Sequence, residues 1–132
     1  MNFRGDGNLV AIIINMNSIH VYGLQSCDNT RKALASFKRK NIDILFHDLK
    51  AGITDIKLED WCKQVGWEKI LNRKSTTWRS LPKEVQDTLR DEGSAIKLML
   101  EYTSLVKRPV IELNNRITVG LSENFLPNNK NK

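Results

Sequence analysis

The chain has 132 residues, a formal net charge of +6 and an isoelectric point of about 9.5. This length fits one domain with a core of its own, and an apolar fraction of 40% is too high for a disordered chain. Two cysteines are too few for a disulfide scaffold, so we expect a cytoplasmic protein with reduced thiols. The positive charge favours anionic partners but does not distinguish nucleic acid from a small anion.

The N-terminal segment NLVAIIINM is apolar, but it is far shorter than the roughly 18 residues that span a bilayer. Arg4 is offset by Asp6, and no small-residue cleavage site follows, so the segment does not resemble a signal peptide. We therefore expect no membrane segment. We interpret residues 1–15 as an extension or an added strand, 16–126 as one domain and 127–132 as a flexible tail.

A β-α-β unit opens the domain. Residues 19–23 (IHVYG) are typical of a strand that ends at a glycine. Ala33, Leu34 and Phe37 then recur at helical spacing, and residues 44–46 form a second short apolar run. The crossover of about a dozen residues predicts two parallel strands with a right-handed connection.

A block of helices is expected next. Leu58, Trp61, Cys62 and Val65 form one apolar helix stripe, which Gly66 closes. The polar segment KILNRKSTTWRSL is expected to be a loop.

Two further helices are expected after that loop. Pro82 is expected to open one that runs to about Arg90, since proline is tolerated in the first turn. Ser94 is the expected N-cap of the other, over AIKLMLEY.

The last part of the domain switches to strands. The segments PVIEL and RITV flank Asn114 and Asn115, which predicts a β-hairpin, and a short helix is expected from Ser122. The sequence therefore predicts an α/β fold with a mixed four-stranded sheet. Its βαβ…ββα order is that of the thioredoxin fold, with a helical insertion between the halves.

Cys27 lies where the first strand ends and the first helix begins. A helix N-terminus stabilises a thiolate and lowers the pKa of a cysteine there. Arg31 adds a positive charge in the first turn, whereas Asp28 acts in the opposite direction. An ordinary thiol with a pKa of about 8.5 is only a few per cent ionised at neutral pH. Position alone does not decide between a nucleophile and a small buried hydrophobe.

Basic residues gather in segments that are expected to flank this cysteine. They are Arg73, Arg79, Lys107 and Arg108, and each by itself is typical of a solvated charge. Pro109 begins a strand, and its Arg-Pro bond is a candidate for the cis isomer. Together with a thiol at a helix start, the cations predict an anion-binding site.

The segments VYGLQSCDNTRKA, FHDL, VGWEKILNRKSTTWRSL and KRPVIEL resemble the arsenate reductase-like family, most closely its YffB-like reductase subfamily. The resemblance covers nearly all of the chain past the extension. It implies a C-x3-R motif with Cys27 as the nucleophile and Arg31 nearby. It further implies that Arg73 and Arg108 clamp an oxyanion or a cysteine-bound glutathione, and that Pro109 is a cis-proline facing the thiol.

Two departures from the family pattern bear on the substrate. The third arginine of arsenate reductases aligns with Gly120, and the histidine shortly before the cysteine is absent. Both departures favour the YffB-like subfamily, for which the resemblance implies glutathione-dependent thiol chemistry. Arg79 and Arg116 are candidates to compensate for the missing arginine.

We therefore expect a thiol–disulfide reductase in which the thiolate of Cys27 attacks a disulfide or an oxyanion. Thr30 stands where a dithiol protein has its second cysteine, so resolution would come from glutathione as co-substrate, with no bound cofactor. Cys62 is interpreted as a core residue, although a resolving role stays open. Arsenate reductase proper is the first alternative.

The same sequence bears on three other functions. A Spx-like regulator that binds RNA polymerase is the non-enzyme alternative, but its usual C-x-x-C switch is missing. Cys27, Cys62, His20 and His47 match no zinc spacing, so we expect no metal site. The basic SFKRKN run lacks a platform of stacking aromatics, which disfavours nucleic-acid binding.

Overall fold

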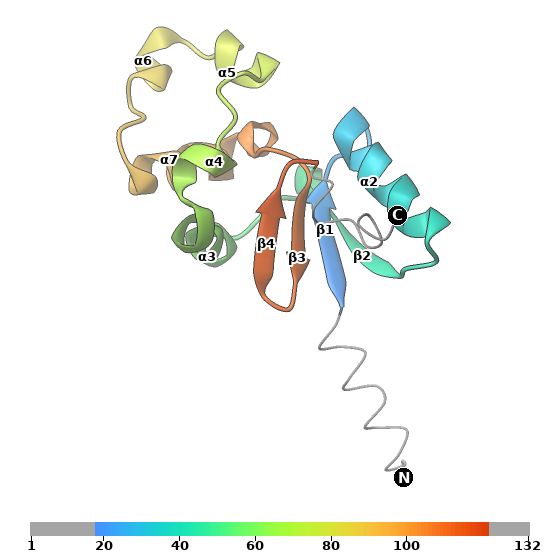
Figure 1. Ribbon diagram of the computed structural model, residues 1–132. Coiled ribbons are helices and arrows are strands. Elements are labelled where there is room, and N and C mark those ends of the chain that lie inside the picture. Colours follow the sequence, from blue (N-terminus) through green and yellow to red (C-terminus); the bar gives the residue numbers. More distant parts are fainter. Residues whose placement is uncertain (1–17, 122–132) are drawn as a thin grey trace.

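The computed structural model describes residues 18–121, and no helix in that range is long and apolar enough to cross a membrane. Its centre is a four-stranded sheet with the order β2-β1-β3-β4 (Figure 1). β1 (Ile19–Gly23) is parallel to β2 (Ile44–Asp48), whereas β3 (Val110–Leu113) is antiparallel to both β1 and β4 (Arg116–Val119). The predicted thioredoxin-like α/β fold is confirmed. The expected N-terminal extension, terminal helix and tail lie outside the described residues.

Two apolar clusters hold helices against opposite faces of the sheet, because alternate strand residues point to opposite sides. On one face, Val21 and Ile111 pack with Ala33 and Phe37 of α2 (Asp28–Arg39). This cluster holds the helix that begins at the candidate nucleophile.

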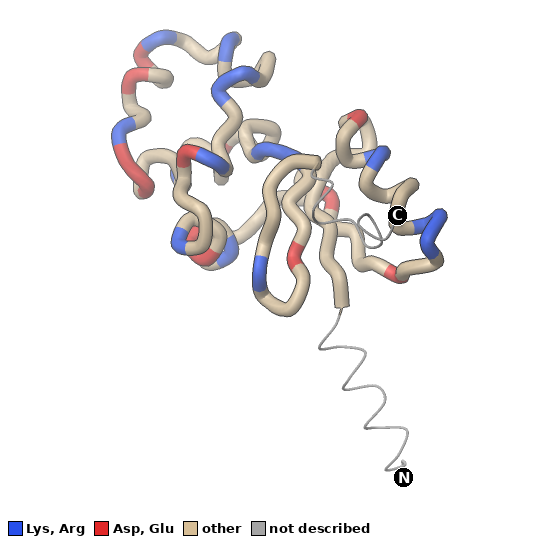
Figure 2. The backbone as a smooth tube through the Cα atoms, viewed as in Figure 1, with Lys and Arg blue, Asp and Glu red and all other residues tan. Residues whose placement is uncertain are grey.

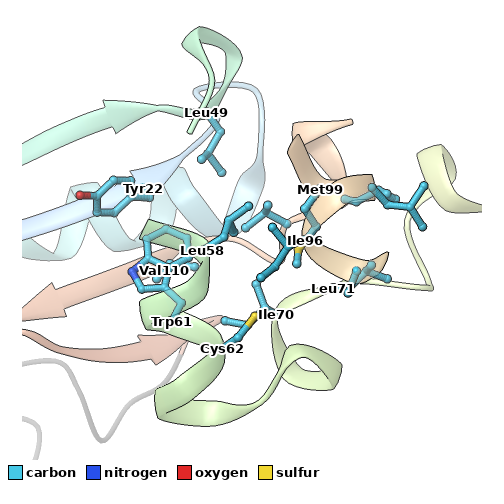
Figure 3. Packing of buried hydrophobic residues seen from close by; sticks show 14 of the residues in the cluster. Tyr22, Leu49, Leu58, Trp61, Cys62, Ile70, Leu71, Ile96, Met99 and Val110 are labelled. Carbon is cyan, nitrogen blue, oxygen red and sulfur yellow. The ribbon is translucent and has the colours of Figure 1, made fainter. Parts of the chain in front are cut away.

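The second, larger cluster lies on the other face. There Tyr22 and Val110 pack with Leu58 and Trp61 of α3 (Asp55–Val65), as Figure 3 shows. Leu58 and Trp61 are completely buried, so the apolar stripe predicted for this helix is confirmed.

A helical insertion separates the two halves of the sheet, as predicted. After α3 the chain makes several short turns of helix before it returns to β3 (Figure 1). The helical elements between β2 and β3 are, in chain order, η1 (Leu49–Ala51), α3, α4 (Trp67–Ile70), α5 (Thr76–Ser80), α6 (Lys83–Gln86), α7 (Glu92–Glu101) and η2 (Thr103–Leu105).

The prediction of a loop over residues 69–81 was wrong, since the segment contains the end of α4 and all of α5. The Ser75 hydroxyl accepts a hydrogen bond from the Trp78 amide at 3.1 Å and so caps α5. A short polar helix that follows a capping serine shows no apolar periodicity in its sequence. For this reason the sequence pattern predicted a loop.

Three boundaries also differ from the prediction. α6 ends at Gln86 rather than near Arg90. The N-cap of α7 is Asp91, and not Ser94. Ser94 is the third residue of the helix and forms a capping box with Asp91, in which the side chain of each residue accepts a hydrogen bond from the backbone amide of the other. β2 continues through Asp48 because its ladder with β1 extends to Gly23.

The hairpin between β3 and β4 is confirmed. Asn114 and Asn115 have φ angles of 54° and 67°, the left-handed region that two-residue hairpin turns require. The hairpin places Glu112 on the α3 face, where its carboxylate accepts hydrogen bonds from Trp61 Nε1 at 2.8 Å and Lys57 Nζ at 3.1 Å. This network ties α3 to the centre of the sheet.

Replacing Glu112 by glutamine is expected to destabilise the fold by about 1–3 kcal/mol at pH 7, because Lys57 loses its charged partner in a largely buried network. Burial raises the pKa of Glu112, but hydrogen bonds from Trp61 and Lys57 outweigh it, so its pKa is lowered. The stability that this carboxylate contributes is present above its unfolded pKa and is lost as the pH falls through the folded pKa.

Urea unfolding at pH 7 and pH 3 measures both effects. The wild-type protein should lose more stability between the two pH values than Glu112→Gln does. The control is Glu59→Gln, which removes an exposed carboxylate from α3, the helix that carries Lys57 and Trp61. Equal pH dependence in the wild type and Glu112→Gln would contradict the assignment.

Candidate active site

Cys27 is the N-cap residue of α2 and follows a tight turn at the end of β1. Its amide donates a hydrogen bond to the Leu24 carbonyl at 3.0 Å, and its own carbonyl accepts one from the Arg31 amide at 3.0 Å. Its side chain is half-buried and makes no capping hydrogen bond to the helix. The predicted position at a strand-to-helix junction is confirmed.

Thr30 fixes the first turn of α2 against β1. Its side chain is completely buried, and its hydroxyl accepts a hydrogen bond from the Leu24 amide at 3.4 Å. A Cβ on Gly23 would lie 2.7 Å from Thr30 Cγ2 and closer still to Oγ1. Only glycine therefore fits at this end of β1 without moving the helix.

The surroundings of Cys27 favour its thiolate. Burial acts to raise the pKa of Cys27, but the Thr30 amide, the Thr30 hydroxyl, the Arg108 side chain and the Asn29 amide together lower it to about 7. These donors lie at the helix N-terminus and on the segment before β3. At neutral pH a much larger fraction of this thiol is therefore ionised than of an ordinary cysteine.

Arg108 and Pro109 lie directly before β3, and the bond between them is cis, as predicted. Arg108 Nη1 donates hydrogen bonds to the Ser104 carbonyl at 2.7 Å and the Val106 carbonyl at 3.3 Å. Its Nε is buried and has no hydrogen-bond partner among the described residues. The guanidinium is thus fixed from one side, beside the thiol.

A cavity of about 770 Å³ opens in front of the thiol. Four cationic residues and one acidic residue are part of its wall, so the cavity is electropositive. Figure 2 shows Lys and Arg in the insertion and in the segment before β3, at the end of the sheet where α2 begins. The lining residues are Cys27, Asn29, Trp67, Glu68, Leu71, Asn72, Arg73, Lys74, Lys107, Arg108, Val119 and Gly120.

The five predicted binding residues do not all meet at this cavity. Arg73 and Arg108 line it, and Pro109 is buried next to Arg108. Arg31 and Arg79 are exposed and are not among the lining residues.

The guanidinium of Arg31 is engaged by neighbouring residues of its own turn. Arg31 forms an ion pair with Asp28 and donates a hydrogen bond to the Gln25 carbonyl at 2.9 Å. Arg31 is not among the groups that lower the pKa of Cys27. We expected Arg31 to stabilise the thiolate of Cys27. In the structure, the groups that lower the pKa of Cys27 belong to Thr30, Arg108 and Asn29 instead.

Sequence reasoning missed two features of the site. Lys74 lines the cavity beside Arg73, and Thr30 supplies two of the donors that act on the thiolate. In the sequence pattern, Thr30 stands out only as the replacement of a second cysteine. A small polar residue three positions after an N-cap is a signal that could have identified it.

Cys62 has the opposite environment. It belongs to the large apolar cluster, beside Ile70 in Figure 3, and only 4% of its surface is exposed. Burial, followed by the charges of Glu92 and Glu68, raises the pKa of Cys62 to about 11. In residues 18–121 no group of three or more His, Cys, Asp or Glu side chains could hold a metal ion.

Comparison with known proteins identifies the family. The profile of the ArsC family matches residues 22–126. A curated relative, an uncharacterized protein of Haemophilus influenzae, is 34% identical over 106 residues, which cover 80% of this chain and 92% of the relative. The chain belongs to the ArsC family.

Two solved structures extend this result, and each is 40% identical to the chain. A YffB protein has a TM-score of 0.75, with 80% of this chain and 92% of the YffB chain covered. An arsenate reductase (ArsC) related protein from Brucella melitensis has a TM-score of 0.66, with 80% and 88% covered. As an ArsC-family member, the chain is an arsenate reductase-like protein.

The pKa of Cys27 predicts how its reactivity depends on pH. Alkylation by iodoacetamide should show a midpoint near pH 7. Thr30→Val keeps the side-chain shape but removes the hydroxyl, so its midpoint should rise. Arg31→Gln should change the midpoint far less, because Arg31 is paired with Asp28. A larger shift in Arg31→Gln than in Thr30→Val would reverse the assignment.

Gly23→Ala should disturb the same turn through a steric clash with Thr30. We expect a loss of about 1–3 kcal/mol in unfolding free energy, together with a raised pKa of Cys27. The effect on stability should be smaller in a Thr30→Ala background, where the two closest atoms, Oγ1 and Cγ2, are absent. Chemical denaturation of the two single variants and the double variant measures this coupling. Additive losses would show that the contact is not the cause.

Proposed function

We propose that this ArsC-family protein is a glutathione-dependent thiol–disulfide reductase of the cytoplasm. Cys27 is the nucleophile, and the cation-lined cavity binds the glutathione part of the substrate. The proposal is carried by one observation: a thiol with a pKa of about 7 at the N-terminus of α2 opens onto a cavity lined by Arg73, Lys74, Lys107 and Arg108.

The pKa of Cys27 suits thiol–disulfide exchange. The thiolate is the attacking species, but its nucleophilicity falls as its pKa falls, so the best attacking thiol has a pKa near the ambient pH. Cys27 meets this condition at neutral pH, whereas Cys62 is buried and its raised pKa keeps it protonated. The chemistry therefore depends on one sulfur.

Resolution by an external thiol follows from the surroundings of that sulfur. Thr30 occupies the position of a second motif cysteine, and Cys62 does not line the cavity. Glutathione carries two carboxylates beside its thiol, and guanidinium groups bind carboxylates through paired hydrogen bonds. Arg73 and Arg108 are the two guanidinium groups on the cavity wall.

The cycle has two exchanges. In the first, the Cys27 thiolate attacks the glutathione sulfur of a mixed disulfide, an S–S bond forms on Cys27, and the other half leaves as a thiolate that takes up a proton. In the second, a glutathione thiolate attacks the sulfur of the bound glutathione. Glutathione disulfide leaves, and the Cys27 thiolate is regenerated. The helix N-terminus, Thr30 and Arg108 stabilise this thiolate as the leaving group.

Arsenate reduction is the second candidate, because a cation-lined cavity in front of a thiolate also suits an oxyanion. Gly120 lies on the cavity wall where the family's third arginine aligns, and it has no side chain to offer an oxyanion. This difference favours the disulfide substrate.

Turnover assays test the proposal. With glutathione, glutathione reductase and NADPH, the wild-type protein should reduce a glutathione mixed disulfide, and Cys27→Ser should fall to the level of the no-enzyme control. Cys62→Ser is the matched control and should keep most of the activity. Full activity in Cys27→Ser would refute the mechanism. Faster turnover of arsenate than of the mixed disulfide would favour the second candidate. No turnover of either substrate, together with binding of RNA polymerase in a pull-down experiment, would favour a regulator.

A further inference from the structure

Arg73 lies on the wall of the active-site cavity and contacts two aromatic rings. Its guanidinium carbon lies 5.7 Å from the ring centre of Trp67 and 6.0 Å from that of Trp78. Both distances are within the range of a cation–π contact. Among the described residues, Arg73 has no ion pair and donates no hydrogen bond, so its N–H groups stay available to a ligand.

The other arginines near Cys27 are held differently. Arg31 uses its guanidinium on Asp28 and the Gln25 carbonyl. Arg108 uses Nη1 on two carbonyls of the preceding turn. Aromatic faces can fix a guanidinium while leaving its edge free, because the contact uses the plane of the cation and not its N–H groups.

The backbone places both tryptophans for this contact. Gly66 has a φ of 91°, and this turn between α3 and α4 makes Trp67 the first residue of α4. The Ser75 cap fixes the first turn of α5 and with it Trp78. Both rings are half-buried and pack against the large apolar cluster, which gives them a rigid support.

The loop that carries Arg73 is tied to the segment that carries Arg108. The Asn72 amide donates a hydrogen bond to the Leu105 carbonyl at 2.8 Å, and the Lys107 amide donates one to the Ile70 carbonyl at 2.7 Å. These two bonds fix the loop of Arg73 relative to the segment of Arg108, which lies beside the thiol. The rings therefore hold the Arg73 guanidinium at a fixed place relative to that segment.

We propose that Trp67 and Trp78 are positioning residues, which hold Arg73 so that its free N–H groups bind the carboxylate of a substrate that reacts at Cys27. The inference rests on the proposed function for the nature of that substrate. It identifies the substrate class as thiol compounds and disulfides that carry a carboxylate near the reacting sulfur.

Two alkylating reagents test this inference without any glutathione assay. Iodoacetate and iodoacetamide both form an S–C bond with the Cys27 thiolate and release iodide, but only iodoacetate carries a carboxylate. The ratio of their rate constants isolates recognition of the carboxylate from the reactivity of the thiolate. Cys62 is buried and protonated, so Cys27 dominates the reaction.

In Trp67→Leu and Trp78→Leu the ratio of iodoacetate to iodoacetamide rates should fall about two- to five-fold, with the iodoacetamide rate and its pH midpoint unchanged. Trp67→Phe should restore part of the ratio, because it keeps an aromatic face. Arg73→Gln should lower the ratio at least as far, and the leucine substitutions should then add nothing. Arg39→Gln removes an equal charge from the far end of α2 and is the matched control.

An unchanged ratio in Arg73→Gln would overturn the inference, as would a ratio that falls in Arg73→Gln but not in either leucine variant. If the leucine variants do not fold, Arg73→Lys decides, since it keeps the charge but loses the planar cation. A ratio as high as in the wild type would then refute a positioned guanidinium, and a lower one supports it.

The outcome is distinct from that of the proposed function. The protein could fail to turn over the glutathione substrate while the tryptophan variants still lower the ratio of iodoacetate to iodoacetamide rates. That result would reject the proposed reductase activity but would support the positioning of Arg73 by the two rings. If turnover is observed, the tryptophan variants should raise the KM for the glutathione substrate and leave kcat close to the wild-type value.

Discussion

The close approach of Thr30 to Gly23 is the contact on which the site depends. Because Gly23 has no side chain, the first turn of α2 lies directly against the end of β1, and Thr30 is completely buried there. The amide and hydroxyl of Thr30 then act on the sulfur three residues earlier. A residue with any side chain at position 23 would separate the helix from the strand and remove the donors that lower the pKa of Cys27.

The cations of the site come from parts of the chain that lie far apart in the sequence. The segment after α4 and the segment before β3 run side by side through an isolated bridge between Leu71 and Val106 and two flanking backbone hydrogen bonds. This pairing brings Arg73 and Arg108 to one cavity. The insertion is therefore part of the candidate active site, since it supplies Arg73 and Lys74, two of the four cations of the electropositive wall.

Each arginine near the thiol has a different electrostatic role, set by what its N–H groups already bind. Arg31 neutralises Asp28, and Arg108 is fixed by carbonyls beside the sulfur. Arg73 is held by aromatic faces and keeps its donors. The two cysteines also differ in their surroundings. Burial raises the pKa of Cys62, whereas the nearby donor groups of Thr30, Arg108 and Asn29 lower that of Cys27.

The sequence by itself determined the sheet, the helices α2 and α3, the hairpin turn and the position of Cys27. These features are written in local patterns: apolar periodicity, the Asn114-Asn115 pair and a glycine at the end of a strand. The short helices α4 and α5 were missed because each is too short to show apolar periodicity, and only α5 has a side-chain cap, from Ser75.

Only the tertiary structure decided which charges serve the thiol. Arg31 is four residues from Cys27 in the sequence but turns to Asp28, whereas Arg108 is distant in the sequence and acts on the sulfur. The reason is physical: electrostatic effects depend on distance and on competing partners, and a pairing such as that of Ile70 with Lys107 sets both without leaving a local pattern.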